Sequence, residues 1–273
     1  MKPKYVKYLV MGIIATLIAT YIAQRDKTPI KGHPRTYEEI IKSGVLRAVT
    51  EYNSLSYFVD GDTISGFHYD LIQAFAESKR LKVEIFPEMS FEKRLRGLEE
   101  GEYDVIAYSI PVTSELKDSI LLTEPILLNK QVLVQRKFSE KDSSLFVHNQ
   151  LDLARKILNV VKGSPAILRI HNLGNEIGDT IFVNEIDKYG QEQLIAMVAH
   201  YDIDYAVCDE NIAIAVIDSF PQLDISTDIS FTQFYSWGVS KQSPALLDSL
   251  NNWLKTFKEE KEYEKLYRKY YKD

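Results

Sequence analysis

The chain alternates between two hydrophobic patterns. Residues 45–50 (VLRAVT), 82–86 and 104–108 are short runs rich in β-branched residues, which is typical of buried strands. Residues 69–79 and 91–99 lie between them and place hydrophobic side chains three and four positions apart, the spacing of one helix face. The order strand, helix, strand, helix, strand predicts an α/β unit built on a parallel sheet.

A second unit of the same kind is predicted after residue 126. Residues 126–135 (ILLNKQVLVQ) predict one long strand, and the polar residues 137–144 that follow indicate a crossing into a second lobe. The alternation then repeats, with strands expected at 157–161, 180–183 and 204–208 and helices at 165–173, 191–200 and 211–217. The sequence therefore predicts two similar α/β units in tandem.

The last part of the chain returns to an extended pattern and ends in a helix. Residues 231–240 are extended, and a long final helix is expected from Ser243 and Pro244. Serine is a favoured helix cap, and proline fits the first turn. The helix carries one apolar face, which requires a sheet to cover.

The N-terminal residues predict export. Residues 8–23 (YLVMGIIATLIATYIA) carry no charge and follow three lysines, a pattern typical of a signal peptide or a membrane anchor. Tyr21 stands where a cleavage site ending at Ala23 would need a small residue, which favours retention as an anchor. The lysines place the N-terminus in the cytoplasm. We therefore expect residues 1–32 to be a signal or anchor with a linker, and a periplasmic or extracytoplasmic protein tethered to the inner membrane by an uncleaved helix.

Composition excludes some functions. The 273 residues carry 33 Lys and Arg against 39 Asp and Glu, a net charge of −6, so we expect no nucleic acid partner. The one cysteine, Cys208, cannot close an intramolecular disulfide and leaves the compartment undecided. The usual enzyme motifs are absent, and the five histidines have no metal-ligand spacing and are expected at surface or boundary positions. We expect no catalytic residue, no metal and no cofactor.

Two segments have the pattern of a ligand site. In Lys162-Gly163-Ser164-Pro165 a strand runs into a helix, and such ends bind anions and polar ligands. In residues 204–211 (DYAVCDEN) Asp209 ends a strand, where a carboxylate can bind a ligand ammonium or hydroxyl. Each segment is also consistent with a plain helix cap, since Ser and Asp are preferred capping residues, and for residues 162–165 taken alone the plain cap is the favoured interpretation.

Four segments together resemble the family-3 extracellular solute-binding proteins: residues 65–71 (SGFHYDL), 103–107 (YDVIA), 204–209 (DYAVCD) and 263–271 (YEKLYRKYY). The resemblance covers residues 36–272. Within the family, the chain looks most like the N-terminal binding domain of the F-type membrane-bound lytic murein transglycosylases. In those proteins a lysozyme-like catalytic domain follows, and we expect none in this chain, which ends at Asp273.

The resemblance implies a type II periplasmic-binding fold. Two α/β lobes with central mixed sheets are then joined by two crossover strands, with lobe 1 at 36–129 plus 230–273 and lobe 2 at 130–229. The ligand is held in the cleft between the lobes, which closes about a hinge.

The resemblance also implies particular ligand contacts. Tyr57 matches the aromatic residue that stacks on the ligand, and Ser109 matches a polar cleft residue. Ser164 matches the hydroxyl at the start of the lobe 2 helix, and Asp209 matches the carboxylate that receives a ligand amine. Tyr108 lies near the presumed cleft and is equally consistent with the aromatic core of lobe 1.

The sequence departs from the family where amino-acid binders carry a serine or threonine and, five residues later, an arginine that clamps the ligand carboxylate. Pro111 and Leu116 occupy these two places. Leucine cannot make the bidentate contact that a carboxylate needs, and Lys117 is turned by about 100° on a helix. A free α-amino acid is therefore not the expected ligand, whereas Tyr52, Tyr57 and Tyr108 suit a sugar, a peptide or a muropeptide.

These observations predict a monomeric, non-enzymatic solute-binding protein that captures a small polar ligand, amino-acid-like, peptide or muropeptide, in the cleft between its lobes for ABC import or for sensing. Its partner is then an ABC permease or a murein hydrolase. Two alternatives remain: a regulatory binding domain of a lytic murein transglycosylase system, and a periplasmic dehydratase-like enzyme on the same fold. For the enzyme, Asp209 and Glu210 are the candidate acids or bases.

Overall fold

The computed structural model describes residues 32–140 and 143–271, of which those from Pro34 onward form one compact unit. The predicted signal or anchor at residues 8–23 lies outside the described residues. Within the described ranges, none of the helices combines the length and the apolar character that crossing a bilayer requires.

The first sheet is mixed. Its strand order is β4 (Lys82–Pro87), β1 (Val45–Thr50), β5 (Val105–Pro111), β13 (Gln233–Val239) and β6 (Leu121–Leu122), and β7 (Leu127–Asn129) also pairs with β13. Strands β4, β1 and β5 are parallel, as the sequence predicts. The returning strand β13 runs antiparallel to β5 and makes the sheet mixed.

The second sheet repeats this arrangement. Its order is β10 (Phe182–Ile186), β9 (Ile157–Val161), β11 (Ala206–Asp209), β8 (Gln131–Arg136) and β12 (Leu223–Asp228). The first three strands are parallel to one another. Strand β8 runs antiparallel to β11, and β12 runs antiparallel to β8. The prediction of two similar α/β units in tandem is therefore confirmed, and both have central mixed sheets.

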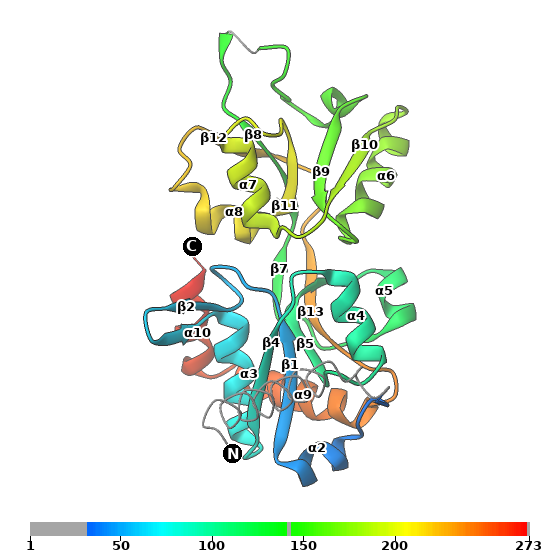
Figure 1. Cartoon of the computed structure of the whole chain (residues 1–273), viewed down its shortest axis with the longest axis vertical. Helices are drawn as coiled ribbons and strands as arrows, with labels where there is room; N and C mark the ends of the chain where they lie inside the picture. The colour runs from blue at the N-terminus through cyan, green and yellow to red at the C-terminus, as the bar shows by residue number, and fades with distance from the viewer. Residues whose placement is uncertain (1–31, 141–142, 272–273) are drawn as a thin grey trace, which may run out of the picture. The chain divides into compact units, whose positions relative to one another are not determined.

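The predicted long strand at 126–135 is two strands that belong to different sheets. β7 pairs in the first sheet and β8 in the second, so the chain crosses at Lys130. The prediction of a crossing at 137–144 was wrong, because only Lys130 separates the two strands, so hydrophobic periodicity alone predicts one continuous strand. The chain returns to the first sheet between β12 and β13, and β12 was not predicted. Strands β7 and β13 of the first sheet run side by side where the chain passes from one sheet to the other (Figure 1).

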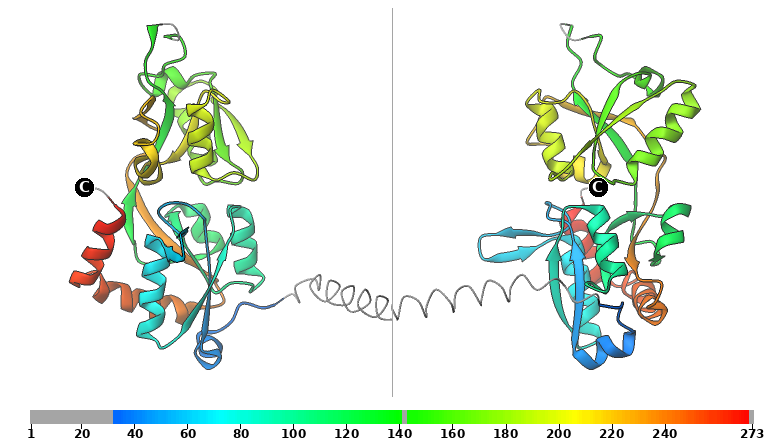
Figure 2. Two further views of the ribbon diagram at one scale, coloured as in Figure 1. Left: turned by 60° about the vertical axis from the view of Figure 1, so that its left-hand side comes forward. Right: turned by 45° about the vertical axis from the view of Figure 1, so that its right-hand side comes forward.

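We keep the proposed bounds and refer to residues 36–129 plus 230–273 as lobe 1 and residues 130–229 as lobe 2. The helices of lobe 1 are α2 (Tyr37–Ser43), α3 (Phe67–Ser78), α4 (Phe91–Glu99), α5 (Ser114–Ser119), α9 (Pro244–Phe257) and α10 (Lys261–Tyr270). Those of lobe 2 are the short 3₁₀ helix η2 (Gln150–Leu153), α6 (Ala166–Ile177), α7 (Gln191–Ala199) and α8 (Glu210–Ile217). A hairpin of β2 (Phe58–Asp60) and β3 (Thr63–Ser65), not predicted, projects from lobe 1 (Figure 2).

The predicted final helix is broken into α9 and α10. Pro244 occupies the first turn of α9 as expected, but the Ser243 side chain makes no capping bond and donates to the Arg35 carbonyl oxygen instead. The apolar face of α9 is buried, with the rings of Trp253 and Phe257 stacked 4.4 Å apart between centroids. The break lets α10 turn back onto α3, where Tyr267 and Tyr271 contact the Phe67 ring.

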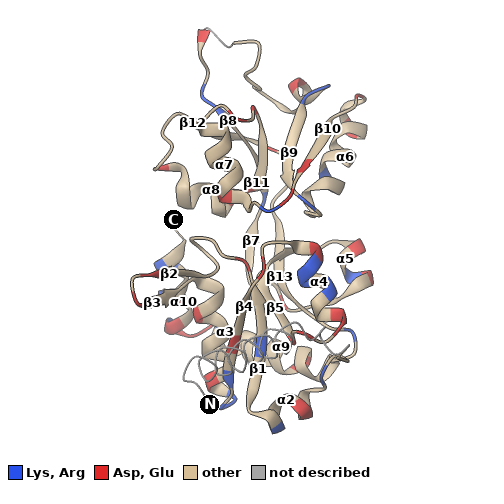
Figure 3. Ribbon diagram, in the orientation of Figure 1, with Lys and Arg blue, Asp and Glu red and all other residues tan. Residues whose placement is uncertain are grey.

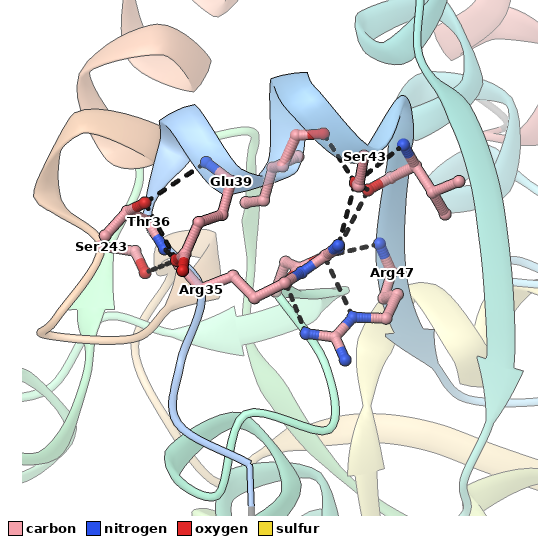
Figure 4. A network of polar contacts seen from close by, with 9 residues as sticks. Arg35, Thr36, Glu39, Ser43, Arg47 and Ser243 are labelled. Atoms are coloured by element: carbon pink, nitrogen blue, oxygen red, sulfur yellow. Dashed lines mark hydrogen bonds and ion pairs between the residues drawn. The ribbon is translucent and has the colours of Figure 1, made fainter.

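A buried carboxylate, Asp104, fastens the start of the described chain to the first sheet through Arg35 and Arg47, two residues that Figure 4 labels. Asp104 accepts hydrogen bonds from Arg35 Nε (2.9 Å), from Arg47 Nη2 (2.9 Å) and from the Arg47 backbone N–H (2.7 Å). Thr36, the next residue after Arg35, caps α2 through a reciprocal bond with Glu39. Both arginines reach one carboxylate, so the entry of the chain and strand β1 are held together.

We expect Asp104→Ala to lower the free energy of unfolding by about 3 kcal/mol, because it leaves two arginines and a backbone N–H without their acceptor. Urea denaturation measures this. Glu264→Ala removes an exposed pair with Arg268 and is the matched control, with an expected loss under about 0.5 kcal/mol. Equal losses in the two variants would contradict the assignment.

Candidate functional site

A buried pocket lies where the carboxyl ends of the parallel strands of both sheets face each other. Glu51 follows β1, Ser109 and Pro111 end β5, Ser164 follows β9, and Asp209 ends β11. Ligands of α/β proteins bind at such strand ends. The cavity measures about 30 Å³ and is lined by Glu51, Phe91, Arg94, Tyr108, Ser109, Pro111, Gln131, Val161, Ser164, Pro165, Gln191 and Asp209.

Four of the five predicted site residues line this pocket together: Tyr108, Ser109, Ser164 and Asp209. The fifth, Tyr57, is not among the lining residues; its ring packs edge-on against Tyr52 and Tyr69, with centroids 6.1 and 5.7 Å away. Tyr108 belongs to the aromatic core of lobe 1 as well as to the pocket. The ligand contacts of all five residues stay predictions.

Arg94 and Glu51 form a buried ion pair that the hydrophobic pattern of the sequence does not predict. Arg94 Nη1 donates to Glu51 Oε2 at 3.0 Å and to the Glu88 carbonyl oxygen at 2.6 Å, and its guanidinium lies 4.5 Å from the Tyr108 ring centroid. Charges of both signs are otherwise spread over both lobes (Figure 3). Burial raises the pKa of Glu51, and the Arg94 charge opposes that rise. One signal was present: Arg94 shares the apolar face of α4 with Phe91 and Leu98.

The Asp209 carboxylate is held by groups from two other elements. Its Oδ1 accepts from the Tyr235 hydroxyl of β13 at 2.9 Å, and its Oδ2 accepts from Gln191 Nε2 of α7 at 3.1 Å. Its side chain makes no capping bond to α8, so the helix-cap interpretation does not describe it. Burial raises the pKa of Asp209 to about 6, although both hydrogen bonds act to lower it.

Ser164 does serve the start of its helix. Its Oγ accepts from the Ala166 backbone N–H at 3.2 Å, but Pro165 holds the N-cap position of α6, so Ser164 lies one residue before the cap. The hydroxyl also lines the pocket, and Gly163 before it adopts φ +69°, a conformation in which glycine is favoured.

Ser109 is positioned by a buried histidine. Trp237 Nε1 donates to His68 Nδ1 at 2.9 Å, so Nε2 carries the proton and donates to Ser109 Oγ at 2.8 Å. Burial lowers the pKa of His68 to about 3. The expectation that His68 lies at the surface or boundary was wrong, because it pairs inside lobe 1. A histidine that donates to the serine cannot accept the serine proton, so the pair is not a nucleophile with its base.

Two polar side-chain atoms on residues that line the pocket have no hydrogen-bond partner in the described structure. They are Arg94 Nε and Gln131 Oε1, on side chains whose residues are 2% and 4% exposed. Buried polar atoms are almost always paired, so an unmatched donor and an unmatched acceptor in one pocket indicate a place for a polar ligand. Gln131 was also missed, because the apolar run that contains it predicts only a strand.

A groove of about 330 Å³ continues from the pocket between α5 and α6. The two share Pro111, Gln131 and Pro165. Leu116, which stands where the family pattern has its arginine, is 9% exposed and packs in the apolar core of lobe 1. The groove is lined by Pro111, Val112, Thr113, Ser114, Glu115, Gln131, Pro165, Leu168, Arg169, Asn172, Ser230, Phe231 and Gln233.

Two α/β lobes with matching mixed sheets and a polar pocket between them define the type II periplasmic-binding fold. Residues 46–273 match the bacterial extracellular solute-binding proteins, family 3, and the chain belongs to this family.

Curated relatives are longer than this chain. Membrane-bound lytic murein transglycosylase F of Photobacterium profundum is 26% identical over 216 residues, 78% of this chain and 41% of that protein. The corresponding protein of Desulfosudis oleivorans is 28% identical over 233 residues, 85% of this chain and 50% of that protein. The chain thus spans half or less of these two relatives.

Solved structures share the fold. ArgBP from T. maritima, as a mutant, has a TM-score of 0.73 at 24% identity, covering 85% of this chain and 97% of that one. An ancestral arginine-binding protein bound to glutamine has a TM-score of 0.72 at 25% identity, with coverage of 83% and 97%. An ancestral amino-acid-binding protein, a precursor of cyclohexadienyl dehydratase, has a TM-score of 0.72 at 22% identity, with coverage of 86% and 99%.

We expect Arg94→Leu to lower the free energy of unfolding by about 3–5 kcal/mol at pH 8, because Glu51 is left buried and unpaired. The loss should be smaller at pH 5, where Glu51 takes up a proton in the folded variant and its burial costs less. Urea denaturation at both pH values measures this. The double variant Arg94→Leu/Glu51→Leu should regain most of the stability, and a double variant no more stable than the single one would contradict the pairing.

Proposed function

We propose that the chain is an extracytoplasmic solute-binding protein that captures a small polar ligand, carrying a protonated amine, in the pocket between its lobes. The observation that carries this proposal is the pair of unpartnered atoms, Arg94 Nε and Gln131 Oε1, beside the buried carboxylate of Asp209. A ligand that brings one acceptor and several donors satisfies all three groups.

The charges of the pocket favour a cation. When Glu51 and Asp209 are both ionised, they outnumber the one arginine, Arg94, among the lining residues. A ligand ammonium beside Asp209 offsets the burial that raises the pKa of this carboxyl and keeps it ionised. Asp209 is therefore proposed as the amine receptor, with Tyr108, Ser109 and Ser164 as polar neighbours and Tyr57 as a stacking residue nearby.

The groove supports a ligand longer than one amino acid. Arg169 is its only arginine or lysine, and Arg169 is already paired with Glu176 and the Ile229 carbonyl oxygen. Leu116 packs in the apolar core, so none of the residues that line the groove offers an unpaired positive charge to a ligand carboxylate. We propose that the ligand continues there through an amide or a sugar, as in a peptide or a muropeptide.

We propose delivery to an ABC permease or sensing as the role of capture, with the protein in the periplasm and tethered through residues 8–23. A second candidate role is regulatory binding in a murein transglycosylase system, which the transglycosylase F relatives favour. We propose binding rather than catalysis, because Glu210, one of the two candidate acids or bases, pairs with Lys130 and does not line the pocket.

A thermal-shift screen tests capture. At a concentration 100 times its Kd, a true ligand adds about 2.7 kcal/mol, or roughly 5–10 °C in Tm for a chain of this size. The screen compares free amino acids with their amides, with di- and tripeptides and with muropeptides. Asp209→Ala should weaken the best ligand by about 30-fold or more. Failure of every compound to stabilise the protein, with Asp209→Ala equally unresponsive, would refute capture.

The affinity for an amine ligand should fall below pH 6. In the free protein the pKa of Asp209 is about 6, so at lower pH the ammonium must displace a proton, which costs up to about tenfold per pH unit. Isothermal titration from pH 5 to pH 8 measures this. Asp209→Asn should show a much smaller slope, and an affinity that is constant between pH 5 and pH 7 would contradict the assigned amine receptor.

A further inference from the structure

The Gln191 carboxamide already occupies the donor position at Asp209. Its Nε2 lies 3.1 Å from Asp209 Oδ2 and 3.0 Å from the Tyr108 hydroxyl oxygen. Its Oε1 accepts from the Asp209 backbone N–H at 2.5 Å. The side chain of the first residue of α7 therefore satisfies the group that the proposed function gives to a ligand amine.

The same amide joins the two lobes. Gln191 and Asp209 belong to lobe 2, whereas Tyr108 is on strand β5 of lobe 1. The next residue, Glu192, makes a second bridge: its Oε1 accepts from the Ser54 backbone N–H at 2.9 Å and from the Ser54 hydroxyl. Ser54 lies in the lobe 1 loop after β1. Two consecutive residues at the start of α7 in lobe 2 thus make hydrogen bonds to lobe 1.

The size of the pocket fits this arrangement. With the Gln191 amide in place the cavity is about 30 Å³, whereas ordinary small-molecule sites measure roughly 300–1,000 Å³. A ligand head group cannot reach Asp209 unless the amide leaves. Once it leaves, Asp209 Oδ2 and the Tyr108 hydroxyl need a donor, and the Asp209 N–H needs an acceptor.

We propose that Gln191 is a specificity-determining residue that acts as an internal occupant of the ligand site, and that Glu192 links its displacement to the contact between the lobes. The part of this inference that concerns displacement by a ligand rests on the proposed function. A ligand that displaces Gln191 has to supply N–H donors beside a carbonyl acceptor, as the carboxamide does. An isolated amine supplies only donors, and a carboxylate supplies only acceptors.

The first experiment uses no ligand. Spin labels at Lys117→Cys on lobe 1 and Asn175→Cys on lobe 2, both exposed positions, report the distance between the lobes, and the buried Cys208 does not compete for label. We expect one short distance in the parent protein and a longer, broader distribution in Gln191→Ala/Glu192→Ala. Gln193→Ala, which changes an exposed residue of the same helix that bonds only to Gly190, should leave the distances unchanged.

The second experiment uses trialanine as probe, which carries an amine beside a carbonyl. Gln191→Ala should bind trialanine about tenfold more tightly than the parent, because the peptide no longer displaces an internal donor. Gln193→Ala should bind like the parent.

Three results would overturn the inference: weaker trialanine binding by Gln191→Ala, equal binding by both proteins, or unchanged label distances in the double variant. If no form binds trialanine, the proposed ligand class is wrong, and the label distances alone then decide whether Gln191 and Glu192 hold the lobes together.

Discussion

The structure depends on how it accommodates charges between two facing sheets. The parallel strands of both lobes end at one place, which brings Glu51 and Asp209 out of water. A buried carboxylate is tolerated only when it is paired and hydrogen-bonded, so each such group requires a partner at fixed geometry. Arg94 comes from α4, Tyr235 from the crossover strand and Gln191 from α7. Because these partners come from both lobes, the position of one lobe against the other depends on this network.

Local patterns predicted the fold well and its connections less well. Hydrophobic periodicity identified β1, α3, β4, α4 and β5 of lobe 1 and β9, α6, β10, α7, β11 and α8 of lobe 2, because each of these elements buries a regular face. It failed at residues 126–135, where Lys130 alone separates two strands of different sheets, and it did not predict the break between α9 and α10. It also missed β12, whose sequence (LDISTD) has no strong apolar alternation. Such features are decided by tertiary pairing, which a short window does not contain.

The candidate site was predicted in part for the same reason. Ser109, Ser164 and Asp209 follow or end strands, so their position in the sequence already places them at the edge of a sheet. Arg94 was missed because a charged helix residue usually faces water, and its partner Glu51 is 43 residues away. Gln191 was missed because a polar residue at a helix start normally has no long-range role. A charged side chain on an apolar helix face, as in α4, was the one usable signal.

Stability alone does not account for this pocket. A buried ion pair contributes little that well-packed apolar residues could not supply, and each unpartnered buried polar atom costs about 1–3 kcal/mol. Four such side-chain atoms occur in the described residues, and two of them, Arg94 Nε and Gln131 Oε1, belong to residues that line this one cavity. Asp209, whose burial disfavours its charged form, lies in the same cavity. Several groups that each lower the stability of the fold are expected in one place where the residues are selected for binding and not for folding. Here that place is the junction of the two lobes.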